Sequence, residues 1–491
     1  MNIEDLLGYA RRTGMFWPAA EIYGGSAGLY DYGHIGAMLK RRFENLWLSY
    51  FVERNQNYFL IDGTTLFPEK PLVASGHAER FNDVLIACKK CKTYYRADVL
   101  LSDLGVHLNE GATPVEVDAA VSANDLKCPK CGGPLGEAKP FNMMIDVALG
   151  PDRSDHGYLR PETAQSAYLN FYREYNLLRQ KLPLGLAIIG RAYRNEISPR
   201  QGLYRLRELI QAELQIFFDE LTFKPDLSSY TDSGMSVVPY ETGKLESLTP
   251  DDLVSRGYPA FYVYHMAIID RFYRNVLGVP DSKFRFLEKG GEDKAFYNRI
   301  HMDIEINVES WGGFKEVGGL HYRGDYDLTS HSKGSNKSML AKSNGREFMP
   351  HVLELSFGVD RNLWAQLDLF FTNADGRQVL SLKPYMAPYS AAVLPLQNDN
   401  SINGTSRDLF LQLSRKFRIF YDSSGSIGKR YARMDEIGTP YCITVDYETV
   451  DSNSKNFQTV TVRKRDSREQ DRVKLSELEN YLQASLVIEF D

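Results

Sequence analysis

The feature that most constrains this chain is a stretch of alternating apolar and charged residues between positions 190 and 219. It contains five arginines, and near its end Leu214, Ile216 and Phe218 alternate with polar residues. Alternation with a period of two predicts a strand with one buried face. The charged residues before it would then lie on a polar loop that joins two strands. Arginine and carboxylate groups on such a rigid hairpin suit the binding of a nucleoside triphosphate together with a small zwitterion.

The length and charge of the chain limit what it can be. A chain of 491 residues predicts a large catalytic body with at least one appended module. The net charge of −6 argues against a protein that coats nucleic acid indiscriminately. Local basic clusters at 463–465 and 429–430 can still meet phosphates, or can simply form a solvated face.

The sequence shows neither a membrane-spanning segment nor a secretory signal. It has no uninterrupted apolar run of about 18 residues, and its first residues lack the regions of a secretory signal. We therefore expect a soluble, cytoplasmic protein with no membrane partner.

Four of the five cysteines form two Cys-x-x-Cys pairs, Cys88 with Cys91 and Cys128 with Cys131, separated by 36 residues. Two such pairs can complete a tetrahedron of thiolates around Zn²⁺, and four cysteines leave no open position for a catalytic water. The alternative, disulfides or free thiols, does not suit a chain without an export signal. We expect a structural zinc site with a helical insert near Pro114. Cys442 is expected to be a buried strand residue.

Two further regions have a readable pattern. Residues 33–51 place apolar side chains at steps of three and four, which predicts an amphipathic helix that faces either the core or a partner. Residues 383–491 alternate short apolar runs, at 391–396, 417–421, 442–445 and 459–462, with helical segments at 409–417 and 427–434. This alternation predicts a small sheet flanked by helices.

Several strings of residues occur in the order typical of one known family. They are Gly28 to Gly33, Leu159 to Gln165, Tyr193 to Glu196, Gly313 to Gly319, Tyr326 to His331 and Glu354 to Arg361. The string at 193 resembles motif 2 of the class II aminoacyl-tRNA synthetases, and the string at 354 resembles motif 3. The longer stretch through Glu213 is similar to the dimeric glycyl members of that family.

The resemblance implies an α+β fold. Its catalytic core would be an antiparallel sheet flanked by helices, with a zinc-binding insertion and a C-terminal α/β anticodon-binding domain. The catalytic domain would occupy residues 1–382, with the zinc-knuckle insertion at about 75–145 and a further insertion at about 220–300. The anticodon-binding domain would occupy residues 383–491. The amphipathic helix at 33–51 would lie at the interface of a homodimer.

The implied reaction is the joining of glycine to tRNA(Gly), by way of glycyl-adenylate formed from glycine and ATP. Two anions meet in such a site, and arginine neutralises both because its planar fork stays charged. By resemblance, the catalytic residues are Arg194, between the α-phosphate and the glycine carboxylate, and Arg361, over the adenine. Their work is positioning and charge stabilisation, and neither is a general base.

The resemblance also implies the binding residues. Glu196 would accept from the adenine amino group, Arg205 would contact the triphosphate, and Glu316 would hold Mg²⁺. The full set for ATP is Arg194, Asn195, Glu196, Arg205, Leu206, Glu316, Val317 and Arg361. The set for glycine is Arg96, Glu162, Glu213, Glu354 and Ser356. Carboxylates converging on one ammonium, with crowding around Cα, would select glycine without an editing site.

The chain departs from the family pattern at four places. Leu209 stands where a phenylalanine usually stacks on adenine, so another aromatic residue must supply the ring if stacking is kept. Leu355 replaces the usual proline between Glu354 and Ser356. Phe314 replaces tryptophan, and His34 with Ile35 replaces a Pro-Leu pair.

Three alternatives stay open. A non-catalytic, synthetase-like tRNA-binding accessory protein typically lacks the arginines of motifs 2 and 3, which are present here. A synthetase for proline, threonine or serine would need a pocket for a side chain. A zinc-ribbon RNA-binding protein would not need the catalytic motifs.

Overall fold

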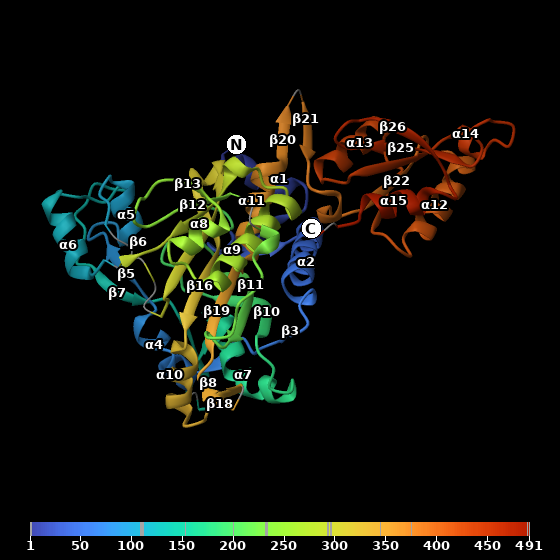
Figure 1. Cartoon of the computed structure of the whole chain (residues 1–491). Coiled ribbons are helices and arrows are strands. Elements are labelled where there is room, and N and C mark those ends of the chain that lie inside the picture. The colour runs from blue at the N-terminus through green and yellow to red at the C-terminus, as the bar shows by residue number, and fades with distance from the viewer. Residues whose placement is uncertain are drawn as a thin grey trace.

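The structure is a computed structural model that describes residues 2–108, 112–152, 154–199, 201–230, 234–291, 294, 297–343, 345–374, 376–488 and 490. Figure 1 shows a central body, an insertion on one side of it and a C-terminal domain on the other. None of the helices in the described part of the chain is long and apolar enough to cross a lipid bilayer.

A nine-stranded sheet forms the centre of the body, in the order β13-β12-β14-β15-β16-β19-β11-β10-β3. In that order the strands are Glu246–Leu248, Met235–Val238, Phe284–Glu288, Ile300–Val308, Gly313–Gly324, His351–Gly358, Glu208–Phe218, Leu184–Tyr193 and Tyr58–Leu60. Neighbours are antiparallel, except that β12 pairs with β14 and β3 with β10 in parallel. The predicted core of antiparallel strands and helices is confirmed.

The predicted hairpin is β10 and β11, paired in antiparallel register from Leu184 opposite Phe217 to Tyr193 opposite Glu208. On β11, Leu214, Ile216 and Phe218 face the main core, which the helices α2 (His34–Leu48), α9 (Ala260–Arg271) and α11 (Val359–Phe370) complete. Phe217 faces the opposite side and packs with α7 (Ala164–Leu177). The period of two along β11 therefore divides core residues from site residues.

The apolar stripe of α2 is buried inside this chain. Leu39, Phe43, Leu46 and Trp47, with Tyr50 beyond the helix end, all belong to the main core and are at most 5% exposed. Of the two predicted roles for the stripe, packing in the core is the one that the structure shows.

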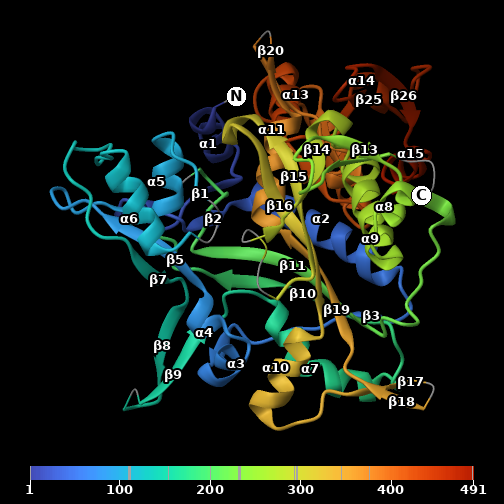
Figure 2. The ribbon, with the colours of Figure 1, turned by 60° about the vertical axis from the view of Figure 1, so that its left-hand side comes forward.

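The cysteine-bearing insertion is a small separate body, visible at the left of Figure 2. It has a three-stranded sheet in the order β6-β5-β7, from Tyr94–Arg96, Asn82–Ala87 and Lys139–Asn142. Two helices, α5 (Ala97–Asp103) and α6 (Pro114–Ala123), pack on it. Thr113 caps α6 through a reciprocal pair of hydrogen bonds with Glu116, which fixes the helix start at Pro114.

The segment from 220 to 300 builds on the central sheet. It supplies β12, β13 and β14 at one edge, together with α8 (Pro250–Ser255) and α9. Tyr262 and Met266 of α9 are fully buried in the main core. This insertion is therefore continuous with the catalytic body.

The C-terminal domain has the predicted sheet flanked by helices. Its strand order is β23-β22-β24-β25-β26, from Ile419–Tyr421, Ala391–Pro395, Tyr441–Val445, Thr459–Lys464 and Gln470–Lys474. Its helices are α12 (Asn400–Leu413), α13 (Ile427–Glu436), α14 (Tyr447–Val450) and α15 (Leu478–Ser485). The helix predicted at 409–417 starts earlier, because the Asp399 side chain accepts from the Ser401 amide and caps it. Cys442 is buried in β24, as predicted.

The remaining elements connect these parts. They are α1 (Ile3–Arg12), β1 (Phe16–Pro18), β2 (Tyr30–Tyr32), β4 (Leu66–Pro68), α3 (Glu69–Ala74), α4 (His77–Arg80), β8 (Ile145–Leu149), β9 (Asp155–Leu159), α10 (Tyr326–Ser335), β17 (Ala341–Ser343), β18 (Arg346–Phe348), β20 (Phe371–Ala374) and β21 (Arg377–Leu380).

Candidate active site

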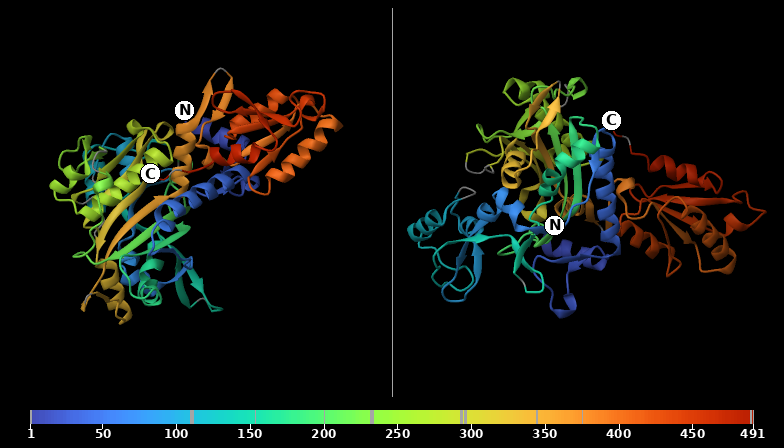
Figure 3. Two further views of the ribbon diagram at one scale, coloured as in Figure 1. Left: turned by 45° about the vertical axis from the view of Figure 1, so that its right-hand side comes forward. Right: turned by 90° about the horizontal axis from the view of Figure 1, so that it is seen from below.

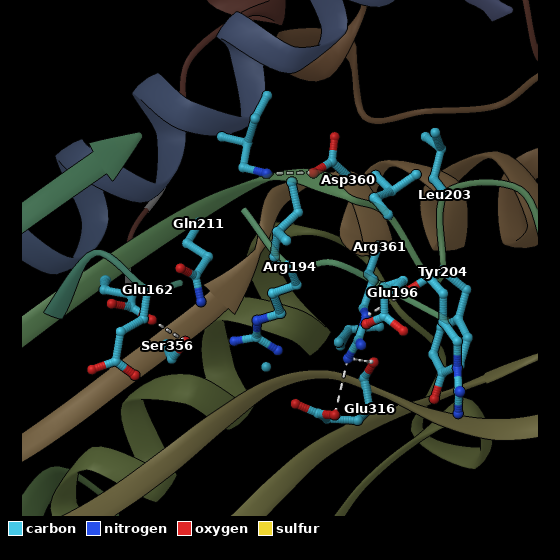
Figure 4. Close-up of a pocket in the computed structure, with 18 of the residues that line it drawn as sticks. Glu162, Arg194, Glu196, Leu203, Tyr204, Gln211, Glu316, Ser356, Asp360 and Arg361 are labelled. Carbon is cyan, nitrogen blue, oxygen red and sulfur yellow. Dashed lines mark hydrogen bonds and ion pairs between the residues drawn. The ribbon is translucent and has the colours of Figure 1, made fainter. Parts of the chain in front are cut away.

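One cavity of about 140 Å³ gathers most of the residues predicted to bind substrate. It lies on the face of the central sheet opposite the main core, over β11, β16 and β19. Its predicted lining residues are Glu162, Arg194, Glu196, Arg205, Leu206, Glu213, Glu316, Val317, Glu354, Ser356 and Arg361. The sequence strings therefore converge in space. Figure 4 shows Arg194 between Glu162 and Ser356 on one side and Glu316 and Arg361 on the other.

Three carboxylates form one end of the cavity. Glu162 lies just before α7, Glu213 on β11 and Glu354 on β19, and they are 8%, 4% and 4% exposed. The sheet register places Glu213 opposite Ser356, whose hydroxyl donates to the Glu213 carboxylate at 2.8 Å. Thr163 donates to the other oxygen of Glu213 at 2.6 Å. A buried cluster of this kind is suited to one small cation.

Basic side chains lower the pKa of two of these carboxylates, Glu354 and Glu162. Arg323 donates to Glu354 at 3.2 Å, and His321 Nδ1 lies 2.5 Å from the other oxygen of Glu354. Burial opposes ionisation, but Arg323 and His321 outweigh it and lower the pKa of Glu354 to about 2. Likewise, burial opposes ionisation of Glu162, but His77, with Nε2 3.4 Å from the carboxylate, holds its pKa well below the usual range.

Glu213 has the opposite environment. Burial, with the nearby charges of Glu354 and Glu162, raises the pKa of Glu213 to about 7. Part of the Glu213 population is thus protonated at neutral pH. An ammonium group entering between the three carboxylates would supply the charge that this site lacks.

Two arginines line the rest of the cavity, Arg361 at the other end and Arg194 between it and the carboxylates. Arg361 donates to the Glu316 carboxylate at 2.9 Å and to the backbone oxygen of Tyr204 at 3.1 Å. Its guanidinium carbon lies 4.6 Å from the centre of the Tyr204 ring. Arg194 donates to the backbone oxygen of Pro161 at 3.2 Å. Both arginines are thereby positioned before any ligand binds.

Two predicted residues do not line this cavity. Asn195 is held by its amide, which donates to the Met143 backbone oxygen at 2.7 Å. Arg96 lies in a neighbouring cavity of about 280 Å³, shared with Arg205. There Arg96 pairs with Asp98 at 2.8 Å and with Asp83 at 3.2 Å. None of the three carboxylates lines this neighbouring cavity.

The structure accounts for two of the departures from the family pattern. Leu355 is buried in the main core opposite Leu214, so it points away from the cavity while Glu354 and Ser356 point in. Leu209 lines the cavity as an apolar surface. Tyr204 also lines it and is the ring that lies against Arg361.

Three residues beside the buried carboxylates were missed from the sequence: His77, His321 and Arg323. Each contacts a carboxylate from a distant segment of the chain. The only available signal was that His321 and Arg323 fall between two of the quoted strings. His331, which belongs to a quoted string, reaches Glu162 through Gln165, with contacts of 2.8 Å on each side of that amide.

The four cysteines of the insertion form a second site. Their sulfur atoms lie within 4.8 Å of one another. The Cys88 and Cys131 sulfurs are 3.6 Å apart, and those of Cys91 and Cys128 are 3.7 Å apart. Zinc–sulfur bonds of about 2.3 Å in a tetrahedron require sulfur separations of about 3.8 Å. The thiols are free of disulfides, so the cluster fits one tetrahedral metal ion.

Solved structures share the fold. A prolyl-tRNA synthetase from Cryptosporidium parvum, solved with L-proline and AMP, aligns with a TM-score of 0.57 over 98% of this chain and 74% of that chain. The sequence identity is 13%, so this likeness concerns the fold alone.

Sequence comparisons are more specific. A family model for the tRNA synthetase class II core domain (G, H, P, S and T) matches residues 147–238, and one for an anticodon binding domain matches residues 390–485. The glycine–tRNA ligase of Thermococcus sibiricus is 36% identical over 97% of this chain and 96% of its own length. That of Aeropyrum pernix is 36% identical over 97% and 95%, and that of Methanothrix thermoacetophila 34% over 96% and 94%. The chain therefore belongs to the glycine–tRNA ligases, a family of ATP-dependent class II aminoacyl-tRNA ligases.

Proposed function

We propose that the cavity joins glycine to ATP to form glycyl-adenylate, and that the chain then transfers the glycyl group to tRNA(Gly). The observation that carries this proposal is the arrangement of three buried carboxylates at one end and Arg361 at the other, with Arg194 between them (Figure 4). A zwitterion can lie across this space with its ammonium group on the carboxylates and its own carboxylate toward Arg194. Every α-amino acid carries this pair of charges, so the pair indicates an amino-acid substrate.

Glycine offers only its two charged ends and its lack of bulk for recognition. Glu162, Glu213 and Glu354 would take the ammonium, and Ser356 lies beside Glu213 where it would border Cα. Arg194 would hold the glycine carboxylate against the α-phosphate of ATP. Arg96, which pairs with Asp98 in the neighbouring cavity beside Arg205, would act there on the nucleotide side.

The nucleotide would occupy the end of the cavity near Arg361. Leu209 and Arg361 would border the adenine, Tyr204 provides the only ring beside Arg361 in the described lining, and Glu196 would accept from the amino group. Glu316 suits Mg²⁺ because its carboxylate lines the cavity and is half-exposed. The metal would neutralise phosphate charge. Glu316 must leave Arg361 when the triphosphate enters.

In the reaction itself, a carboxylate oxygen of glycine forms a bond to the α-phosphorus while the bond to the pyrophosphate oxygen breaks. The electron pair of that bond leaves with pyrophosphate, so the protein has no proton to move. Arg194 and Arg361 would stabilise the charge that spreads over the phosphorus oxygens. Positioning would supply the rest of the acceleration.

The other partners follow from the remaining parts of the chain. Cys88, Cys91, Cys128 and Cys131 would hold a structural Zn²⁺, and the C-terminal domain would bind the anticodon region of tRNA(Gly). We infer a cytoplasmic homodimer from the family resemblance. The apolar stripe of α2 is buried in this chain, so these side chains would not form the dimer contact.

The test is pyrophosphate exchange into ATP with glycine, using Arg194→Ala and the matched control Arg191→Ala. Arg191 lies on β10, three residues before Arg194, but its side chain is 59% exposed and pairs with Glu208 outside the cavity. We expect a loss of at least about 100-fold for Arg194→Ala, as for loss of one charge-stabilising donor, and little change for the control. Equal activity of the two variants would remove Arg194 from the reaction. An accessory protein without catalysis would show no exchange in the wild type.

A further inference from the structure

A second large cavity, of about 920 Å³, lies where the catalytic body meets the C-terminal domain. One wall is Arg42 of α2, and the opposite wall is the segment from 414 to 418 before β23. Figure 3 shows α2 running beside the C-terminal domain in both views. An apolar rim, Leu486 to Ile488, closes one side. Nothing in the proposed chemistry uses this cavity.

The cavity gathers four cations: Arg42, Arg415, Lys416 and Arg418. Lys416 pairs with Glu479 at 2.5 Å. The Arg42 Nε and one terminal nitrogen of Arg418 are buried and have no hydrogen-bond partner in the described part of the chain. An unsatisfied buried donor destabilises the folded state, and a charged one does so more strongly.

Ser390 contacts both the Arg42 side chain and the backbone of Arg418. Ser390 accepts from Arg42 through its hydroxyl at 3.5 Å, and its amide donates to the backbone oxygen of Arg418 at 2.8 Å. Burial, and then the nearby charge of Arg418, lowers the pKa of Arg42. Two neighbouring guanidinium groups that repel each other are suited to binding an anion between them.

The basic clusters that stand out in the sequence are used differently. Arg463 donates to both oxygens of Asp435, at 2.9 and 3.0 Å, and is 7% exposed. Arg465 is 2% exposed and donates to the backbone oxygens of Gly438 and Leu382. Arg430 is 1% exposed and donates to the Pro395 backbone oxygen. These three arginines are buried and hydrogen-bonded inside the domain, so their guanidinium groups are not available to bind phosphate.

We propose that Arg42 and Arg418 form a phosphate-binding site for the RNA backbone at the joint between the two domains. The proposal rests on the proposed function, since tRNA is the one ligand that must reach both the anticodon-binding domain and the active site. A site built from α2 on one side and the C-terminal domain on the other would hold the RNA between those two ends. It would also fix the angle between the domains when RNA binds.

The experiment is equilibrium binding of a tRNA(Gly) transcript to the full-length chain between 50 and 200 mM salt. The variants are Arg42→Gln, Arg418→Gln and Arg418→Lys, and the control is Arg41→Gln. Arg41 is on the same helix, but its side chain is 68% exposed and pairs with Glu44. Each lost phosphate contact should weaken binding about eightfold at 0.1 M salt and reduce the salt slope by about 0.9. Arg418→Lys should keep the slope.

Three results would overturn the proposal. The first is an unchanged slope in both glutamine variants while the wild type binds tRNA, which would leave the proposed function intact. The second is a changed mass in sedimentation without changed RNA binding, which would make the cavity an interface between copies of the chain. The third is a wild type that does not bind the transcript, which would contradict the proposed function as well. The unfolding temperatures of Arg42→Gln and Arg418→Gln should be equal to or above that of the wild type, since each of these two substitutions removes one of two neighbouring like charges.

Discussion

Glu213 is predicted to lower the free energy of unfolding at neutral and higher pH. The substitution Glu213→Gln should therefore raise it. Its pKa rises from an ordinary value of 4.5 to about 7 because it is buried beside Glu354 and Glu162. The folded state then binds more protons than the unfolded state between these values, so stability falls as the pH rises through that window. The difference of about 2.5 pKa units corresponds to about 3 kcal/mol above pH 7. Glutamine keeps the shape and carries no charge.

The assay is the unfolding temperature of the ligand-free protein from pH 5 to pH 8. Glu213→Gln should unfold at a higher temperature than the wild type at pH 8, and the gain should shrink to less than about 1 kcal/mol at pH 5. Glu241→Gln, an exposed glutamate on a loop, is the matched control and should show no pH-dependent difference. A Glu213→Gln variant that is destabilised at pH 8, or changed equally at both values, would refute the electrostatic account.

Ionisation of Glu213 should also control glycine binding. The KM for glycine should rise about tenfold from well above pH 7 to pH 6, because only ionised Glu213 attracts the ammonium. A KM that does not change with pH in pyrophosphate exchange would contradict this. Arg323→Met should lower the free energy of unfolding, measured in urea, by about 3–5 kcal/mol. The substitution leaves two buried carboxylates without their cation, because Asp327 and Glu354 lie 2.7 and 3.2 Å from the Arg323 guanidinium. A loss below about 1 kcal/mol would show that these ion pairs are not needed for stability. Metal analysis should find one zinc per chain, and a chelator should remove hydrogen-exchange protection from β5, β6 and β7 while the central sheet keeps it; clearly less than one zinc in fresh protein would exclude the four-cysteine site.

Much of the fold could be predicted because the deciding patterns are local. The alternation along β11 fixes which side chains face the core, so the placement of Glu213 in the site follows from the burial of Leu214 and Ile216. The two Cys-x-x-Cys pairs likewise each fix a turn, and the structure brings their four sulfurs together. The resemblance supplied the order of the motifs, and the sheet register of β11 with β19 explains why they meet.

The rest depends on contacts between distant segments. His77 and Arg323 matter because they lie beside buried carboxylates, and no local pattern marks such a pair. Composition also cannot distinguish an arginine that is paired with a buried carboxylate, such as Arg463, from one with a buried nitrogen that has no hydrogen-bond partner in the described residues, such as Arg42. The strand at 470–474 and the helix at 478–485 were missed because their exposed faces are strongly polar.

The central claim is that three buried carboxylates beside Arg194 select and activate glycine. The most direct measurement is pyrophosphate exchange into ATP with each of the twenty amino acids in the absence of tRNA. The account predicts exchange with glycine alone. Exchange with alanine or a larger amino acid at a comparable rate would contradict the assignment of the cavity, and no exchange with any of them would contradict activation without tRNA.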